Sequence, residues 1–436
     1  MKTGTNLWSQ AAAVAAKTPE SRNRYVDFLR ALSICAVVCG HWLVAAPHAV
    51  GDEILLQNML EYQPWTQWLT WVFQVMPVFF IVGGYSNGVS WNAALRDGKP
   101  YGEWLRGRLQ RLIGPMLPLL VVWVLLGAVG HQVGVSVEMI KVASQMALIP
   151  IWFLAVYVMV CVVVPFTYAA WQRFGMWSFF VLAAAVVLDD TLFFAADLRI
   201  VGWFNYGFIW LAVHQFGYAW LNGRVSGAAR ALPWALGGFA VLVGLVTFGP
   251  HPVSLVSVPG ETVSNSLPPK LPLLVLGIAQ GGLLLSLEGP LRRWLARPAP
   301  WIATVLVNGM IMTVFLWHLT ASSLVIGAVW VLNGLGLHAE PGSGFWWFFR
   351  PAWFLVYIIA LALFSLVFGR FERGGGSVGV AAWRLIVGAM LVCGGLSLIA
   401  LHGIGGEGFL GLRWWVVLLP FAGAVLANIN PLRRTG

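Results

Sequence analysis

Three ionisable side chains at the start of the first apolar run have types and spacings that could do chemistry at a membrane. Asp27, Arg30 and His41 lie within residues 24–41, RYVDFLRALSICAVVCGH. Eleven helical steps of about 100° return to within about 20° of the starting direction, so Arg30 and His41 share one face, about 16 Å apart along the axis. Asp27 precedes Arg30 at the spacing where an acid and a base meet on a helix. Because ionisable groups within a span normally face a bundle interior or a wet cavity, this stripe predicts a polar seam entering the bilayer.

The stripe has a functional and a structural explanation. A histidine inside a span can simply hydrogen-bond a carbonyl of a neighbouring helix. The presence of Arg30 on the same face as His41 favours function, because isolated structural residues have no reason to share a stripe.

The composition determines the class of protein that must position these residues. The chain is 59% hydrophobic and 10% charged, far from the soluble norm of about 25% charged. The net charge of +10 does not indicate nucleic-acid binding, because the basic residues form short clusters between apolar runs, as the positive-inside rule expects. The four cysteines lie inside apolar runs, and their spacing resembles no metal site. The composition therefore predicts a polytopic membrane protein.

A window of about 20 residues identifies twelve candidate spans, which predict an all-α transmembrane helix bundle. They run over residues 27–47, 67–90, 112–130, 146–168, 177–196, 200–221, 232–248, 271–288, 301–333, 349–370, 379–402 and 409–428. Loops after even-numbered spans are rich in arginine, and those after odd-numbered spans are not, so both termini are predicted to be cytoplasmic. The weak points are the short gap at residues 197–199 and the ninth run, which is long enough to tilt or break.

The chain is expected to divide into three parts. Residues 1–24 are a polar cytoplasmic tail, because their apolar segment is too weak for a signal peptide. Residues 25–370 hold ten core helices, and residues 371–436 add two more helices and a short cytoplasmic tail. The stretch GGGS at residues 374–377 looks like a flexible joint between the last two parts.

Five segments in register give the chain a resemblance to the acyltransferase-3 family of membrane-bound acyltransferases. The first is the Arg30-to-His41 spacing of the opening span. The other four are similar to family segments in the second, third, fourth and ninth spans: VFFIVGGY at 78–85, RLQRLIGP at 108–115, IWFL at 151–154 and FLWH at 315–318.

The resemblance implies an O-acyltransferase that moves an acyl group, usually acetyl, from cytoplasmic acyl-coenzyme A. The acceptor would be a hydroxyl of a cell-envelope carbohydrate, a glycolipid or a secondary metabolite, and no metal is implied. The resemblance makes His41 the general base or a transient acyl acceptor, because imidazole exchanges protons near neutral pH. The remaining roles are donor binding by Arg30, Arg108 and Arg111, orientation of Arg30 by Asp27, and acceptor binding by His318, Trp152 and Asp190.

Each of these secondary roles has a structural alternative. Arg108 and Arg111 could be plain topology determinants. His318 follows a tryptophan that suits an interfacial belt, and Asp190 could pair with Arg199 instead of an acceptor.

Two other classes of function compete with acyl transfer. A transporter or lipid flippase would also use many spans, polar residues and proline breaks, although the chain has no evident repeat and its stripe starts at the cytoplasmic mouth. A scaffold in an envelope-synthesis complex would tolerate replacement of Arg30 and His41. The high content of Gly, Ala, Val and Trp fits a bacterial source. The expected location is a cytoplasmic membrane.

Overall fold

The computed structural model describes residues 7–19, 22–51, 53–372 and 379–432 and is almost entirely helical. It contains two compact units, each assembled from separate stretches of the chain. The first consists of Met1–Gly40, Gln63–Ser90 and Phe166–Ile311, and the second of His41–Tyr62, Trp91–Pro165 and Met312–Gly436. Helices α2, α5 and α9 each contribute residues to both units.

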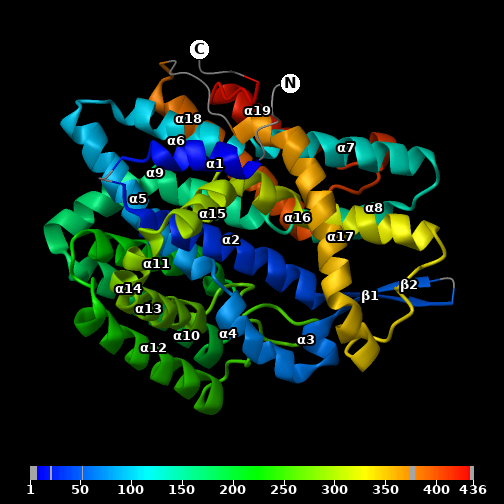
Figure 1. Ribbon diagram of the computed structural model, residues 1–436, viewed down its shortest axis with the longest axis horizontal. Coiled ribbons are helices and arrows are strands. Elements are labelled where there is room, and N and C mark those ends of the chain that lie inside the picture. Colours follow the sequence, from blue (N-terminus) through cyan, green and yellow to red (C-terminus); the bar gives the residue numbers. More distant parts are fainter. Residues whose placement is uncertain (1–6, 20–21, 52, 373–378, 433–436) are drawn as a thin grey trace. The chain divides into compact units, whose positions relative to one another are not determined.

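The first unit is a bundle around the long helices α10 to α13. Helices α12 and α13 lie side by side (Figure 1). Its elements are α1 (Leu7–Ala16), most of α2 (Arg24–Val44), η1 (Pro64–Leu69), α4 (Thr70–Phe73), most of α5 (Met76–Arg96), α10 (Met176–Ala195), η2 (Val201–Phe204), α11 (Asn205–Leu221), α12 (Ala228–Phe248), α13 (Leu271–Ser286), α14 (Glu288–Leu295) and α15 (Pro298–Asn308).

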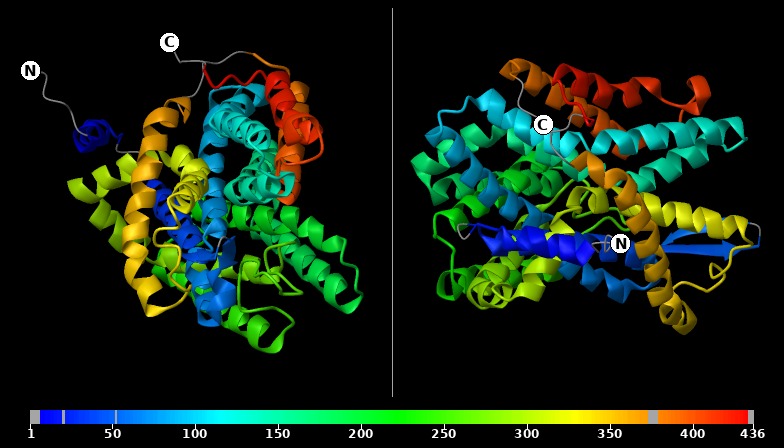
Figure 2. Two further views of the ribbon diagram at one scale, coloured as in Figure 1. Left: turned by 90° about the vertical axis from the view of Figure 1, so that its right-hand side faces the viewer. Right: turned by 45° about the horizontal axis from the view of Figure 1, so that its top comes forward.

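The second unit contains the C-terminal helices together with α6 to α9. Helices α18 and α19 lie against each other (Figure 2), and they also contact α6, α7 and α8. Its elements are β1 (Ala45–Val50), β2 (Glu53–Asn58), α3 (Met59–Tyr62), α6 (Tyr101–Ile113), α7 (Met116–Gln132), α8 (Val137–Ala147), most of α9 (Ile151–Phe174), α16 (Ile311–Val331), α17 (Gly344–Phe368), η3 (Gly369–Glu372), α18 (Ala382–His402), η4 (Phe409–Gly411) and α19 (Trp414–Leu426).

Every predicted span contains a helix, and the polytopic all-α class is confirmed. Within the described ranges, nine helical stretches are long and apolar enough to cross a membrane, or ten if the bent pair α13 and α14, at 55°, counts as one. Helices α11 and α19 are shorter, with 17 and 13 residues. The long ninth run does break, because α15 ends at Asn308 and α16 begins at Ile311.

The first span differs from the prediction at its C-terminal end. Helix α2 stops at Val44, and the chain turns into an antiparallel hairpin in which Ala45 pairs with Asn58 and Val50 with Glu53. Pro47 explains the stop, because proline lacks an N–H and disfavours the helical conformation in the residue before it. The turn contains Gly51 at φ 58°, which glycine adopts without strain.

Two predicted features at the chain ends have different outcomes. The tail at residues 1–24 contains helix α1, which packs against α15 and buries Ala11 and Ala15. The joint at residues 374–377 lies outside the described residues, as do Asp52, Arg373, Arg433 and Arg434. The three-part division of the chain stays a prediction.

Candidate active site

A pair of histidines on two helices forms the centre of the candidate site. His41, at the end of α2, and His318, in the middle of α16, have their Nδ1 and Nε2 atoms 2.8 Å apart. Their rings are parallel within 5°, with centroids 5.1 Å apart. His318 is fully buried, whereas His41 is partly exposed. Residues 277 positions apart in the sequence are thus in direct contact.

The hydrogen bonds of His318 fix the tautomers of the pair. Its Nδ1 lies 2.8 Å from the carbonyl oxygen of Phe315, and a carbonyl can only accept, so Nδ1 carries the proton. In neutral imidazole the other nitrogen is then an acceptor. His318 Nε2 must therefore accept from Nδ1–H of His41, which leaves Nε2 of His41 as an unprotonated nitrogen with an available lone pair.

Aromatic side chains surround the histidine pair. The indole of Trp42 donates to the backbone oxygen of His318 at 3.3 Å. The ring of Phe315 meets that of Phe153 edge-on, with centroids 5.4 Å apart. Phe153 is the neighbour of Trp152 at the start of α9, so the sequence segment that contains Trp152 lies against the segment that contains His318.

A second polar cluster lies near the start of α2, in the first unit. Asp27 is buried and accepts from Arg30 Nη1 at 3.2 Å and from Arg22 Nε at 2.5 Å. The hydrogen bond to Asp27 raises the pKa of Arg22. Arg30 Nη2 donates to the hydroxyl of Ser86 at 2.6 Å, and Asn308 donates to the backbone oxygen of Asp27. The Arg30 guanidinium is therefore held from two sides.

Close packing of two helices positions the serine of this cluster. Ser86 lies on α5, which approaches α11 at two glycines. A Cβ added at Gly84 would lie 2.0 Å from the carbonyl oxygen of His214, and one at Gly217 would lie 2.1 Å from that of Ile81. Only glycine permits this backbone contact, which sets the distance of α5 from its neighbours.

The two arginines expected to bind the donor lie on α6, one turn apart. The guanidinium of Arg108 lies over the Trp104 ring, 5.5 Å from its centroid. Arg111 is exposed, and its Nε donates to the carbonyl of Gly107 within the same helix. Both are reachable from solvent, and the (i, i+3) spacing puts them on one face of the helix.

Asp190 belongs to a buried network in the first unit. Its Oδ1 accepts from Asn205 at 3.0 Å, and its Oδ2 accepts from the backbone N–H of Leu271, the first residue of α13, at 2.7 Å. His251 Nε2 lies 3.7 Å from the same Oδ2. The expected alternative partner, Arg199, pairs with Asp197 instead. Both oxygens of Asp190 thus have protein partners, and the bond to Leu271 stabilises the start of α13.

Sequence reasoning missed several residues that complete these clusters. Ser86 and Asn308 carry no charge and gave no signal, because their partners are distant in the sequence. Arg350, which lies outside these clusters, was also missed, although a lone cation in the apolar run of α17 is itself a signal of a functional residue.

The fold and these polar clusters define a multi-pass membrane protein with ionisable groups inside its spans. A family model described as an acyltransferase domain matches residues 23–349. This match covers most of the chain, so the protein belongs to the acyltransferase-3 family and is a membrane acyltransferase. No curated protein and no solved structure matches the chain.

Proposed function

We propose that this protein is an O-acyltransferase, most simply an O-acetyltransferase, of a bacterial cytoplasmic membrane with both termini in the cytoplasm. The donor is acetyl-coenzyme A or another acyl-coenzyme A from the cytoplasm. The acceptor is a hydroxyl of an envelope carbohydrate, a glycolipid or a secondary metabolite. The observation that carries the proposal is the histidine pair, whose hydrogen bonds leave one imidazole nitrogen of His41 ready to take a proton.

In this proposal His41 is the general base. Its Nε2 takes the proton of the acceptor hydroxyl while the hydroxyl oxygen attacks the thioester carbonyl. The tetrahedral intermediate then expels the coenzyme A thiolate, which receives that proton from His41. The products are the acyl ester and free coenzyme A, so atoms and charge balance. If His41 instead carries the acyl group transiently, the same Nε2 is the nucleophile.

His318 acts through His41 in this scheme. By accepting from Nδ1–H it holds the His41 ring in one orientation and one tautomer. We therefore propose His318 as a positioning residue, in addition to its expected place near the acceptor with Trp152. Asp190 remains a proposed acceptor contact, although its present partners support the structural alternative.

The arginines supply positive charge for the donor. Arg30, oriented by Asp27, the half-buried Arg108 and the exposed Arg111 are proposed to bind phosphates of coenzyme A, because guanidinium matches phosphate geometry. One carboxylate between Arg22 and Arg30 leaves that cluster with a net positive charge.

The direct test is acyl transfer from labelled acetyl-coenzyme A in purified membranes. His41→Ala should lose about 10²- to 10⁴-fold in rate, the usual contribution of a general base. His402→Ala is the matched control, because His402 is exposed at the end of α18. Normal transfer by a His41→Ala protein inserted at the normal level would refute the role of His41, and substrate movement in vesicles without any acyl donor would favour a transporter.

A further inference from the structure

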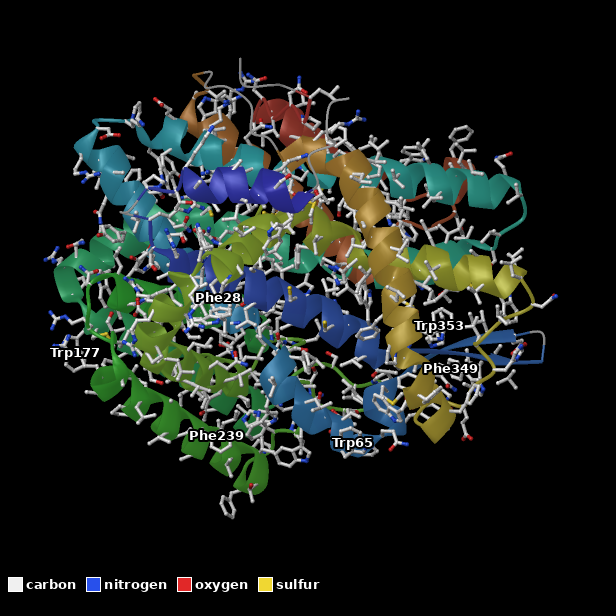
Figure 3. All side chains as sticks on the ribbon, viewed as in Figure 1. Phe28, Trp65, Trp177, Phe239, Phe349 and Trp353 are labelled. Atoms are coloured by element: carbon white, nitrogen blue, oxygen red, sulfur yellow. The ribbon has the colours of Figure 1, made fainter. Side chains whose placement is uncertain are left out.

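A shallow groove of about 570 Å³ runs along α17 beside the end of α2, within the second unit. Six of its seven lining residues are apolar or aromatic, among them Leu43, Trp347 and Phe354, and the seventh is Arg350. Many other apolar side chains of α17 are exposed, including Phe349, which Figure 3 labels on this helix. Exposed apolar side chains on a membrane-spanning helix face lipid chains, so this groove opens to the bilayer.

Arg350 is a cation without an anion. It is only 6% exposed, and its partners are neutral. They are the Trp346 ring, 3.6 Å from the guanidinium, the carbonyl oxygen of Ala45, at 2.5 Å from Nη2, and the side-chain hydroxyl of Tyr357. None of the ion pairs among the described residues involves it. Its Nε–H is buried and has no hydrogen-bond partner in the described part of the chain. A charge inside a span normally pairs with an opposite charge, so this groove lacks an anion.

We propose that the groove binds a membrane lipid with an anionic phosphate headgroup. The phosphate pairs with the guanidinium of Arg350, and the acyl chains lie on the apolar residues of α17. Guanidinium is the side chain best matched to phosphate, and basic pockets between membrane helices suit anionic headgroups. Trp346 and Trp347 fit the same depth, because tryptophan collects at the headgroup level.

Trp42 connects the proposed lipid site to the histidine pair. The ring of Trp42 contacts Phe354 of the groove, with centroids 5.6 Å apart, while its indole N–H donates to His318. The proposal does not depend on acyl transfer, because lipid binding can be measured without any acyl donor.

Native mass spectrometry of the full chain in detergent tests the site. Phosphatidylglycerol and phosphatidylcholine are added separately, and the retained lipid is counted. The wild type should retain phosphatidylglycerol about tenfold more strongly, which corresponds to about 1.4 kcal/mol. Arg350→Gln should lower this retention to the level of phosphatidylcholine. Arg384→Gln, a change at an exposed arginine of α18, should behave as the wild type does.

Three outcomes would overturn the proposal. They are equal retention of the two lipids by the wild type, unchanged retention by Arg350→Gln, and displacement of the lipid by millimolar inorganic phosphate, which would mean that the site takes phosphate alone. If Arg350→Gln fails to insert, Ile358→Trp decides the question. This change fills the groove at an exposed position without removing the cation. Reduced retention of phosphatidylglycerol by that variant supports the site, and full retention overturns it.

Discussion

Removal of the His318 side chain should lower kcat indirectly, because His41 loses the hydrogen bond that orients it. The structure gives His318 one role toward its partner, which is to accept the Nδ1–H hydrogen bond at 2.8 Å. A buried donor left without its acceptor costs about 1–3 kcal/mol. In His318→Ala the tautomer and ring orientation of His41 that catalysis needs become less stable by this amount, so kcat should drop about 5- to 150-fold. This loss is smaller than the loss expected for His41→Ala.

A double-mutant cycle separates this positioning role from independent contributions. Labelled acyl transfer is measured for His41→Ala, His318→Ala and the double variant, each at matched insertion levels. Residues that act as a unit are non-additive, so the double variant should be no slower than His41→Ala alone.

A conservative variant, His318→Gln, distinguishes this positioning role from a purely structural one. In His318→Gln the amide oxygen can still accept from Nδ1–H of His41, so part of the rate should return and the pH profile should approach that of the wild type. Additive losses in the cycle, or full activity of His318→Ala, would refute the reasoning.

Three further predictions concern packing, pH and donor binding. Gly84→Ala would place a methyl group 2.0 Å from a backbone oxygen of α11. This overpacking should lower the free energy of unfolding by about 1–3 kcal/mol and therefore lower the melting temperature in detergent. Gly237→Ala, whose added methyl group meets nothing within 4 Å, should be neutral or stabilising. Burial lowers the pKa of His251, in the loop after α12, to about 4; the unfolded chain then binds more protons between about pH 6.5 and 4, so stability is present above this range and falls by up to about 3 kcal/mol on acidification through it. The double change Arg108→Gln and Arg111→Gln should raise KM for acetyl-coenzyme A about tenfold with little change in kcat, and added salt should weaken donor binding less in this variant than in the wild type.

Each of these predictions has a result that would contradict it. Equal melting temperatures of the two glycine variants would mean that α5 and α11 can separate freely. In a His251→Gln variant, the loss of stability on acidification should be smaller than in the wild type. An unchanged dependence of the melting temperature on pH would assign that loss to other groups. An unaltered KM in the arginine variant would make Arg108 and Arg111 topology determinants only.

The helical class and the contact between Asp27 and Arg30 could be predicted because both depend on local pattern. Apolar runs of about 20 residues predict spans without knowledge of their neighbours, and the i, i+3 spacing brings an acid and a base together on one helix. The same reasoning missed the hairpin after Val44, because the start of its first strand, Ala45–Val50, continues the apolar run of α2 up to Pro47.

Contacts between distant segments could not be predicted in this way. The sequence offered His41 and His318 as separate candidates, but it had no means of indicating that their rings touch. Nor could it show that a neutral Ser86 binds Arg30, or that Asp190 accepts from the first residue of α13. These facts depend on which helices are neighbours.

The carbonyl of Phe315 also determines the regiochemistry of any covalent labelling. Because it occupies one nitrogen of His318, and His318 in turn occupies one nitrogen of His41, the two rings together expose a single nucleophilic nitrogen. An acylating or alkylating reagent should therefore mark the pair once, at Nε2 of His41. Any acyl-imidazole trapped during turnover should have the same connectivity.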